Sequence, residues 1–244
     1  MLVDVLYMVR SDPKGHLGRR SLDRLRAFGD GYSQFQPFRE FRGVGEALRN
    51  WILDLYRVDS DAVRTLNSYG ILRRIAPDDE SAFDLFFQSL DAVLAANPDL
   101  VKNPEMIGDR KGRAPLPVSS FLNTLTTHPY MLLGNRLEPG ILRALLDGYR
   151  LAYLENGFIE CADLDGFEHW IRRKLVGVRG VFRWENVVLS EFQGREEQAC
   201  IWAIEELRNF RASLGPFTGR NCGADSEKGS ESSKERDAGA EPPA

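Results

Sequence analysis

An internal duplication constrains the fold of this chain more than any other feature of its sequence. The segment DPKGHLGRRSLDRLRAFGDGY at 12–32 returns as HPYMLLGNRLEPGILRALLDGY at 128–149, with one residue inserted near Pro139. The matched residues are Pro13, Leu17, Gly18, Arg20, Leu25, Arg26, Ala27, Asp30, Gly31 and Tyr32 in the first copy, and Pro129, Leu133, Gly134, Arg136, Leu142, Arg143, Ala144, Asp147, Gly148 and Tyr149 in the second. Such a repeat predicts two copies of one structural unit that share a long interface.

Composition places the chain among ordinary globular proteins. Its 244 residues are 43% apolar and 28% charged, which is enough for two units with cores of their own. The net charge of −4 gives no overall attraction to nucleic acid or to anionic lipid. Because Asp4 interrupts a short apolar N-terminal run that has no cleavage site, we expect a cytoplasmic protein with no membrane contact.

Apolar spacing predicts an all-α fold built from two tandem helical units of about 95 residues each. In the first copy, Leu22, Leu25, Phe28 and Tyr32 fall on one helical stripe, and the second copy repeats this pattern. Further helices are predicted at 2–9, 46–56, 81–95, 164–175 and 196–212. The segment 37–45 is expected to be irregular, and turns are expected around Gly18 and Gly134.

Two short segments, 62–75 and 182–192, are ambiguous between helix and strand. In the second of them, Trp184, Val187 and Val188 follow helical spacing, so helix is the preferred interpretation. The alternative is an α+β fold with one short strand in each unit.

Proline, glycine and polar residues mark the boundaries of the units. We expect a first unit, a linker, a second unit and a tail at 1–96, 97–117, 118–214 and 215–244. The linker carries a basic cluster of Arg110, Lys111 and Arg113, which is expected to be solvated. The tail has almost no large apolar residue and is expected to be disordered.

Gly31 and Gly148 lie inside helical patterns, where glycine costs about 1 kcal/mol relative to alanine. The compensation that we predict is the close approach of another helix backbone, with the neighbouring tyrosine packed over the contact. The alternative is a kink that shapes a binding cleft.

Two matching pairs, Arg26 with Asp30 and Arg143 with Asp147, lie one helical turn apart. In both pairs the arginine precedes the aspartate, which is the less stabilising order on a helix. Stability alone therefore does not explain the pairs. They are either solvated surface ion pairs that contribute little or part of a patch that binds a partner. The candidate binding residues are therefore Arg20, Arg26, Asp30, Tyr32, Arg136, Arg143, Asp147 and Tyr149.

No pattern in the chain points to a catalytic centre. The three histidines, His16, His128 and His169, have neither HExxH spacing nor a cysteine motif beside them. Nucleophile-elbow and phosphate-loop motifs are missing too, and the three cysteines are widely spaced. The sequence therefore predicts no catalytic residue, no metal and no cofactor.

The repeated element, P-x3-LG followed by a helix ending L-R-A-x2-DGY, leads in each half to an F/L-x2-W-I helix and to a closing helix with an acidic start. This arrangement resembles a family of small bacterial helical domains that open with a run close to RPxMYLG and continue SLxxLxxFxxGY. Some members resemble immunity-type proteins found beside bacterial toxins. The first copy departs from the opening run at Lys14, Gly15 and His16.

The resemblance favours a non-enzymatic protein-binding module, of the immunity type that neutralises a toxin by binding it. One alternative is an enzyme or small-ligand binder with a pocket at the junction of the units. That pocket would be lined by Arg20, Asp30, Tyr32, Arg136, Asp147 and Tyr149. The other alternative is nucleic-acid binding through the first unit, where Arg10, Lys14, Arg19, Arg20, Arg24 and Arg26 gather near aromatic residues.

Overall fold

The computed structural model describes residues 2–35, 40–59, 62–102, 117–155, 162–175 and 183–214, and every regular element in them is a helix. The all-α prediction is confirmed for these residues. The two ambiguous segments form α5 (Ser68–Ile75) and α12 (Trp184–Glu191), so the α+β alternative is wrong there.

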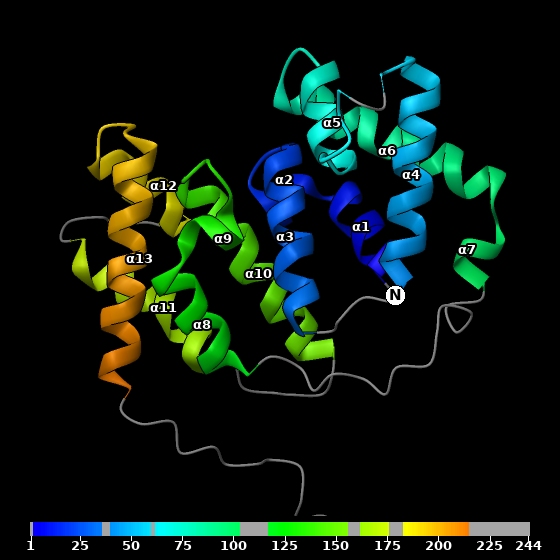
Figure 1. The fold of residues 1–244 in the computed structure, drawn as a ribbon. Helices are drawn as coiled ribbons and strands as arrows, with labels where there is room; N and C mark the ends of the chain where they lie inside the picture. The colour runs from blue at the N-terminus through cyan, green and yellow to red at the C-terminus, as the bar shows by residue number, and fades with distance from the viewer. Residues whose placement is uncertain are drawn as a thin grey trace, which may run out of the picture.

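The helices follow one another in a similar order in the two halves (Figure 1). The first half contains α1 (Leu2–Ser11), α2 (Pro13–Leu17), α3 (Leu22–Phe35), α4 (Glu40–Tyr56), α5, α6 (Asp79–Ala96) and α7 (Asp99–Lys102). The second half contains α8 (Val118–Thr127), α9 (Pro129–Leu133), α10 (Pro139–Glu155), α11 (Ala162–Lys174), α12 and α13 (Glu196–Ser213). Four pairs of helices have the same length in the two halves. The lengths are 10 residues for α1 and α8, 5 for α2 and α9, 8 for α5 and α12, and 18 for α6 and α13. This order is what a duplication predicts, and the duplication itself stays a prediction.

The chain forms two short helices where only turns were predicted. In the first copy, the Asp12 side chain accepts a hydrogen bond from the Gly15 amide at 2.7 Å, and Pro13 occupies the first turn of α2. Proline suits that position because the first amides of a helix have no partner within it. Gly18 and Gly134 follow α2 and α9 with positive φ values of 83° and 75°.

Two boundaries differ from the predictions. The α4 helix begins at Glu40, inside the segment that was expected to be irregular. Val44 of this stretch is buried in the core, which offsets the weak helix propensity of the neighbouring Gly45. The short α7 helix lies at the start of the predicted linker. The basic cluster of that linker and the whole tail lie outside the described residues.

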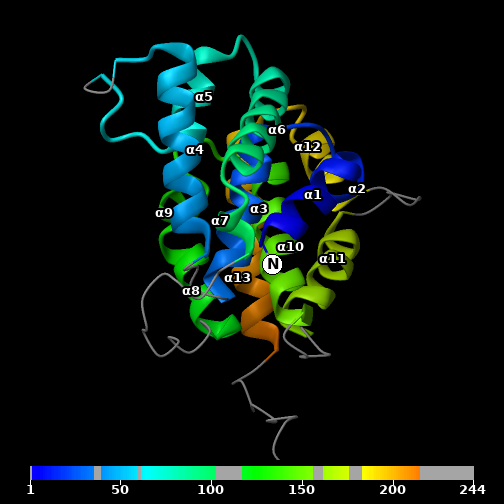
Figure 2. The ribbon, with the colours of Figure 1, turned by 90° about the vertical axis from the view of Figure 1, so that its right-hand side faces the viewer.

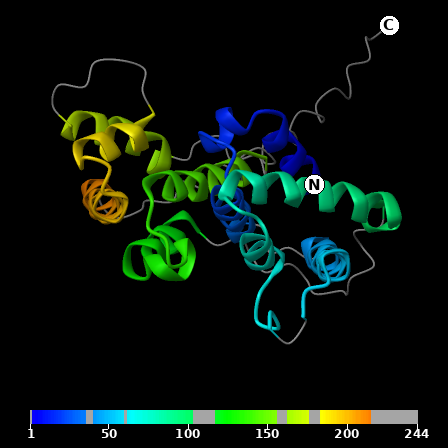
Figure 3. The same cartoon turned by 90° about the horizontal axis from the view of Figure 1, so that it is seen from above.

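The two halves meet along α3 and α10, which lie at the centre of the molecule in both side views (Figures 1 and 2). Seen from above, the helices of the first half lie on one side and those of the second half on the other (Figure 3). The contact between α3 and α10 is the most extensive contact between any two elements of the described chain. Buried apolar side chains from both halves form one continuous core.

Glycines allow α3 and α10 to touch backbone to backbone. A Cβ atom built on Gly31 would overlap the carbonyl oxygen of Leu145, and one built on Gly148 would overlap the carbonyl oxygen of Phe28. Phe28 and Leu145 precede their glycines by the same three residues, so the two contacts are reciprocal. The predicted close approach of a helix backbone is confirmed, and a side chain at either glycine would push the helices apart.

Candidate functional site

Each glycine of the crossing directly follows an aspartate, and an arginine lies one helical turn before that aspartate. On α3, Arg26 Nε lies 3.9 Å from Asp30 Oδ2, and on α10, Arg143 Nε lies 3.2 Å from Asp147 Oδ2. Arg26 also reaches across to the other half, where Nη2 donates to the carbonyl oxygen of Leu133 at 2.9 Å. That carbonyl ends α9, and a cation is favourable at the negative end of a helix. The pair on α3 therefore also holds α9 in place.

The pair on α10 continues into a buried cluster. Arg143 Nη1 donates to Glu185 Oε1 at 2.8 Å, and the Glu185 side chain is only 2% exposed. Arg183 Nη1 lies 3.9 Å from the same oxygen. Arg183 Nη2 donates to the carbonyl oxygens of Lys14 and Gly15 in the first half. An arginine from each half thus binds backbone carbonyls of a short helix in the other half.

The two copies differ in the residue that faces their arginine–aspartate pair. Tyr69 is the second residue of α5, and Glu185 is the second residue of α12. Burial raises the pKa of the Tyr69 phenol, and the negative charge of Asp30 raises it further. The first copy therefore holds a neutral phenol near its aspartate where the second holds a carboxyl group.

The two aspartates share an electrostatic property. Burial raises the pKa of Asp30 to about 6, and the Arg26 charge opposes this rise. Burial also raises the pKa of Asp147 to about 6; the Arg143 charge opposes the rise, and the negative charge of Glu185 adds to it. An unfolded aspartate has a pKa of about 3.9, so folding strengthens proton binding at both positions.

These shifts predict how stability changes with pH. A group whose pKa is raised by folding contributes stability that is fully present below the unfolded pKa of about 3.9 and is lost as the pH rises through about 6. Asparagine at position 147 cannot ionise, so the Asp147→Asn variant lacks that loss. We expect the melting temperature of the variant to rise relative to that of the original protein between pH 5 and pH 7. Thermal unfolding followed by circular dichroism at pH 5, 6 and 7 measures this.

The counterpart variant, Asp30→Asn, should show the same trend with a smaller amplitude, because the Asp30 side chain is 50% exposed and solvent weakens the effect. A difference in melting temperature that is constant between pH 5 and pH 7, or that shrinks as the pH rises, would contradict the raised pKa values.

Arg20 and Arg136, which are matched in the predicted duplication, each pair with the closing helix of their own half, and Arg136 Nη1 also lies 3.4 Å from Asp23 Oδ2 in the first half. Arg20 Nη1 lies 3.5 Å from Glu80 Oε1, and Arg136 Nη2 lies 3.4 Å from Glu196 Oε2. Both glutamates lie in the first turn of the closing helices, α6 and α13. Each arginine therefore ties the start of its central helix to the closing helix of the same half.

The matched tyrosines point into the interior. The Tyr32 hydroxyl donates to a carboxylate oxygen of Glu155, at the end of α10, and the Tyr32 side chain is buried. Tyr149 is fully buried and stacks on Phe121 of α8, with ring centroids 4.2 Å apart and planes within 4°. Neither ring is available on an open surface. A partner contact by any of the eight predicted residues stays a prediction.

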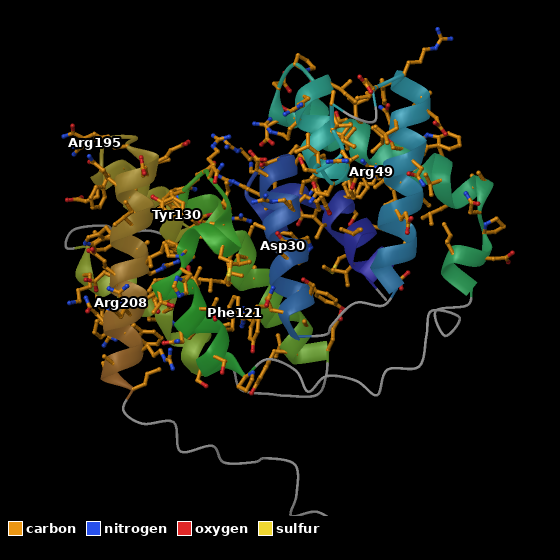
Figure 4. All side chains as sticks on the ribbon, viewed as in Figure 1. Asp30, Arg49, Phe121, Tyr130, Arg195 and Arg208 are labelled. Atoms are coloured by element: carbon orange, nitrogen blue, oxygen red, sulfur yellow. The ribbon has the colours of Figure 1, made fainter. Side chains whose placement is uncertain are left out.

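Sequence reasoning did not single out the exposed apolar residues of α9. Tyr130 is 54% exposed and Met131 is 67% exposed, and they are adjacent on a helix of five residues. Figure 4 places Tyr130 on α9, on the second half's side of the junction with α3. At the equivalent positions of α2, the first copy has Lys14 and Gly15, which are also exposed. The departure of KGHLG from PYMLLG was the signal that could have identified this difference.

The described residues contain no cluster of three or more histidine, cysteine or acidic side chains that could hold a metal ion. Among the same residues, no helix has the length and apolar character needed to cross a bilayer. Of the three cysteines, Cys200 is buried and unpaired, while Cys161 and Cys222 lie outside the described part of the chain. Comparison with protein families, with curated proteins and with solved structures gives no match.

Proposed function

We propose that this protein is a non-enzymatic binding module that neutralises a protein toxin by covering part of the toxin's surface. The single observation that carries the proposal is the exposure of Tyr130 and Met131 next to each other on α9. Tyrosine and methionine are enriched where proteins bind one another, and a folded chain gains nothing by leaving both in water. The surface that we propose for the partner is therefore α9, which Arg26 holds against α3.

The placement of the predicted pocket residues supports binding over catalysis. Arg20 and Arg136 form ion pairs with the closing helices, and Tyr32 and Tyr149 are buried. Four of the six side chains that would line a pocket at the junction thus have structural partners. Their arrangement is typical of residues that hold two halves together.

The proposal can be tested by crosslinking in the cells that produce the protein. A photoreactive amino acid replaces Tyr130 in one variant and the equivalent exposed residue Lys14 in the other. We expect a covalent adduct with one protein from position 130 and none from position 14. Mass spectrometry then identifies the partner, and its expression alone should arrest growth unless this protein is expressed with it. An adduct from neither position, or a partner that is harmless when expressed alone, would contradict the proposal.

A second prediction uses the purified pair. Serine at Tyr130 or at Met131 removes most of the apolar contact, so each substitution should raise the Kd for the partner by about tenfold or more. Titration calorimetry measures the Kd. The matched control is Leu55→Ser, because Leu55 is 56% exposed on α4, away from the proposed surface. An unchanged Kd for both α9 variants, or an equal rise for the control, would place the binding surface elsewhere.

A further inference from the structure

A buried ion pair joins the two halves near the N-terminal end of α10. The side chain of Arg24, on α3, is 9% exposed, and that of Glu138, just before α10, is 3% exposed. Arg24 Nε donates to Glu138 Oε1 at 3.1 Å, and Nη2 donates to the same oxygen. Arg24 Nη1 donates to the carbonyl oxygen of Leu17 at 2.8 Å. Every nitrogen of the guanidinium group therefore has a partner.

The start of α10 is shaped to receive this arginine. A Cβ atom built on Gly140 would overlap the guanidinium group of Arg24. Any side chain at position 140 would displace Arg24 from Glu138, so the glycine belongs to the same arrangement as the pair.

The ion pair has no counterpart on the other side of the crossing. Ser21 directly precedes α3, and Glu138 directly precedes α10. The Ser21 carbonyl oxygen accepts a hydrogen bond from the Leu25 amide at 2.9 Å. In the same way, the Glu138 carbonyl oxygen accepts one from the Leu142 amide at 3.0 Å. Because Leu25 and Leu142 are matched residues, Ser21 is the equivalent of Glu138, and Arg24 is the equivalent of Ile141. Ser21 and Ile141 are both buried and carry no charge. The backbone contacts of the crossing are reciprocal, but its charges are not.

We propose that the pair of Arg24 and Glu138 makes the first and second units bind each other and prevents either unit from binding a second copy of itself. In a pair of first units, Arg24 would face Ser21, and Asp23, the equivalent of Gly140, would place its side chain in the space that the Arg24 guanidinium group fills. In a pair of second units, Glu138 would face Ile141. Each of these leaves a buried charge without the partner that the structure gives it, and such a loss is strongly unfavourable. The partner that fits the first unit is a module with a carboxylate before its central helix and a glycine two residues later.

Two further arginines surround Glu138. Arg19 of the first unit lies 3.2 Å from Glu138 Oε2, and Arg136 of the second unit lies 3.5 Å from it. Two of the three arginines around the carboxylate thus come from the first unit. A pair of second units would keep only Arg136, because the residue equivalent to Arg19 is Asn135.

The test begins with the full folded chain. A site for a specific protease is placed within 103–116, between α7 and α8, and the chain is cleaved there after folding. The cleaved protein is held in urea below its unfolding transition, so that the units can exchange, and is then returned to buffer. Native mass spectrometry separates the three possible pairs, because the two units differ in mass.

For the original sequence we expect only the pair of first with second unit. The Arg24→Ile and Glu138→Ser variant gives each unit the residue of the other copy, so that neither self-pair buries an unpaired charge. Self-pairs should then appear beside the mixed pair, and their share should rise towards the half of all pairs that random pairing gives. The single variants separate the roles: Arg24→Ile should allow pairs of first units, and Glu138→Ser should allow pairs of second units.

The matched control replaces the exposed pair within the first unit, as Arg20→Ala with Glu80→Ala, and should leave the pairing of first with second unit exclusive. Self-pairs at a statistical level for the original sequence would overturn the proposal. So would a double variant that folds and still forms only the mixed pair, or cleaved units that do not associate at all.

Discussion

Alanine at Gly31 is expected to lower the free energy of unfolding by about 3 kcal/mol, the upper end of the range for overpacking. The added methyl group would overlap the carbonyl oxygen of Leu145, which is part of a helix backbone and cannot rotate away. The two helices must then separate along their most extensive contact. The Gly148→Ala variant should behave alike, because its methyl group would meet the carbonyl oxygen of Phe28. Urea denaturation measures both changes.

The same helix offers a control of opposite sign. Gly29 lies two residues before Gly31, and the nearest atom to a Cβ built there is the Tyr69 hydroxyl oxygen at 3.9 Å, an ordinary contact distance. Alanine is a better helix former than glycine, so Gly29→Ala should raise the free energy of unfolding by about 0.5–1 kcal/mol. Stabilisation by Gly31→Ala of the same size as that by Gly29→Ala would mean that the helices do not touch there.

Loss of the Glu138 carboxylate is the second large effect that we expect. The Glu138→Ala variant leaves the Arg24 guanidinium buried without its charge partner, and breaking a buried pair in this way costs about 3–5 kcal/mol. In contrast, Glu80→Ala removes an ion pair whose glutamate is 64% exposed, and it should cost less than about 1 kcal/mol. Chemical denaturation of the two variants under identical conditions gives the comparison.

A double variant separates the loss of a partner from the loss of packing. When Arg24→Ile is combined with Glu138→Ser, no buried charge is left unpaired, because Arg19 and Arg136 are 48% and 41% exposed. Most of the cost of Glu138→Ala should therefore disappear. If the double variant is as unstable as Glu138→Ala, the cost lies in packing and the ion pair contributes little.

The fold could be predicted where a local pattern decides it. Helical spacing identified the central and closing helices, and a glycine inside a helical stripe pointed to the backbone contact at Gly31 and Gly148. The short helices α2 and α9 escaped prediction because five residues carry too little periodicity, and only the cap at Asp12 marks the first of them. The start of α4 was missed because glycines in a packed helix look the same in sequence as glycines in a loop.

The functional surface was harder to predict, because its partners are far apart in sequence. Arg24 and Glu138 are separated by 114 positions, and nothing near either residue indicates that they meet. Tyr32 and Tyr149 occupy matched positions of the predicted duplication, but the sequence could not show that both rings are buried. The exposure of Tyr130 and Met131 could not be derived either, since five residues do not show which side of a helix faces the core.

The reciprocal crossing of α3 and α10 is the claim on which the other inferences depend, and nuclear Overhauser effects test it most directly. The Cβ position of Gly31 lies 3.1 Å from the Tyr149 amide nitrogen, and that of Gly148 lies 3.1 Å from Phe28 Cα. In the labelled full-length protein we expect a cross-peak between a Gly31 Hα and the Tyr149 amide proton, and another between a Gly148 Hα and the Phe28 Hα. Assigned spectra that lack both cross-peaks, or that show one without the other, would contradict the crossing.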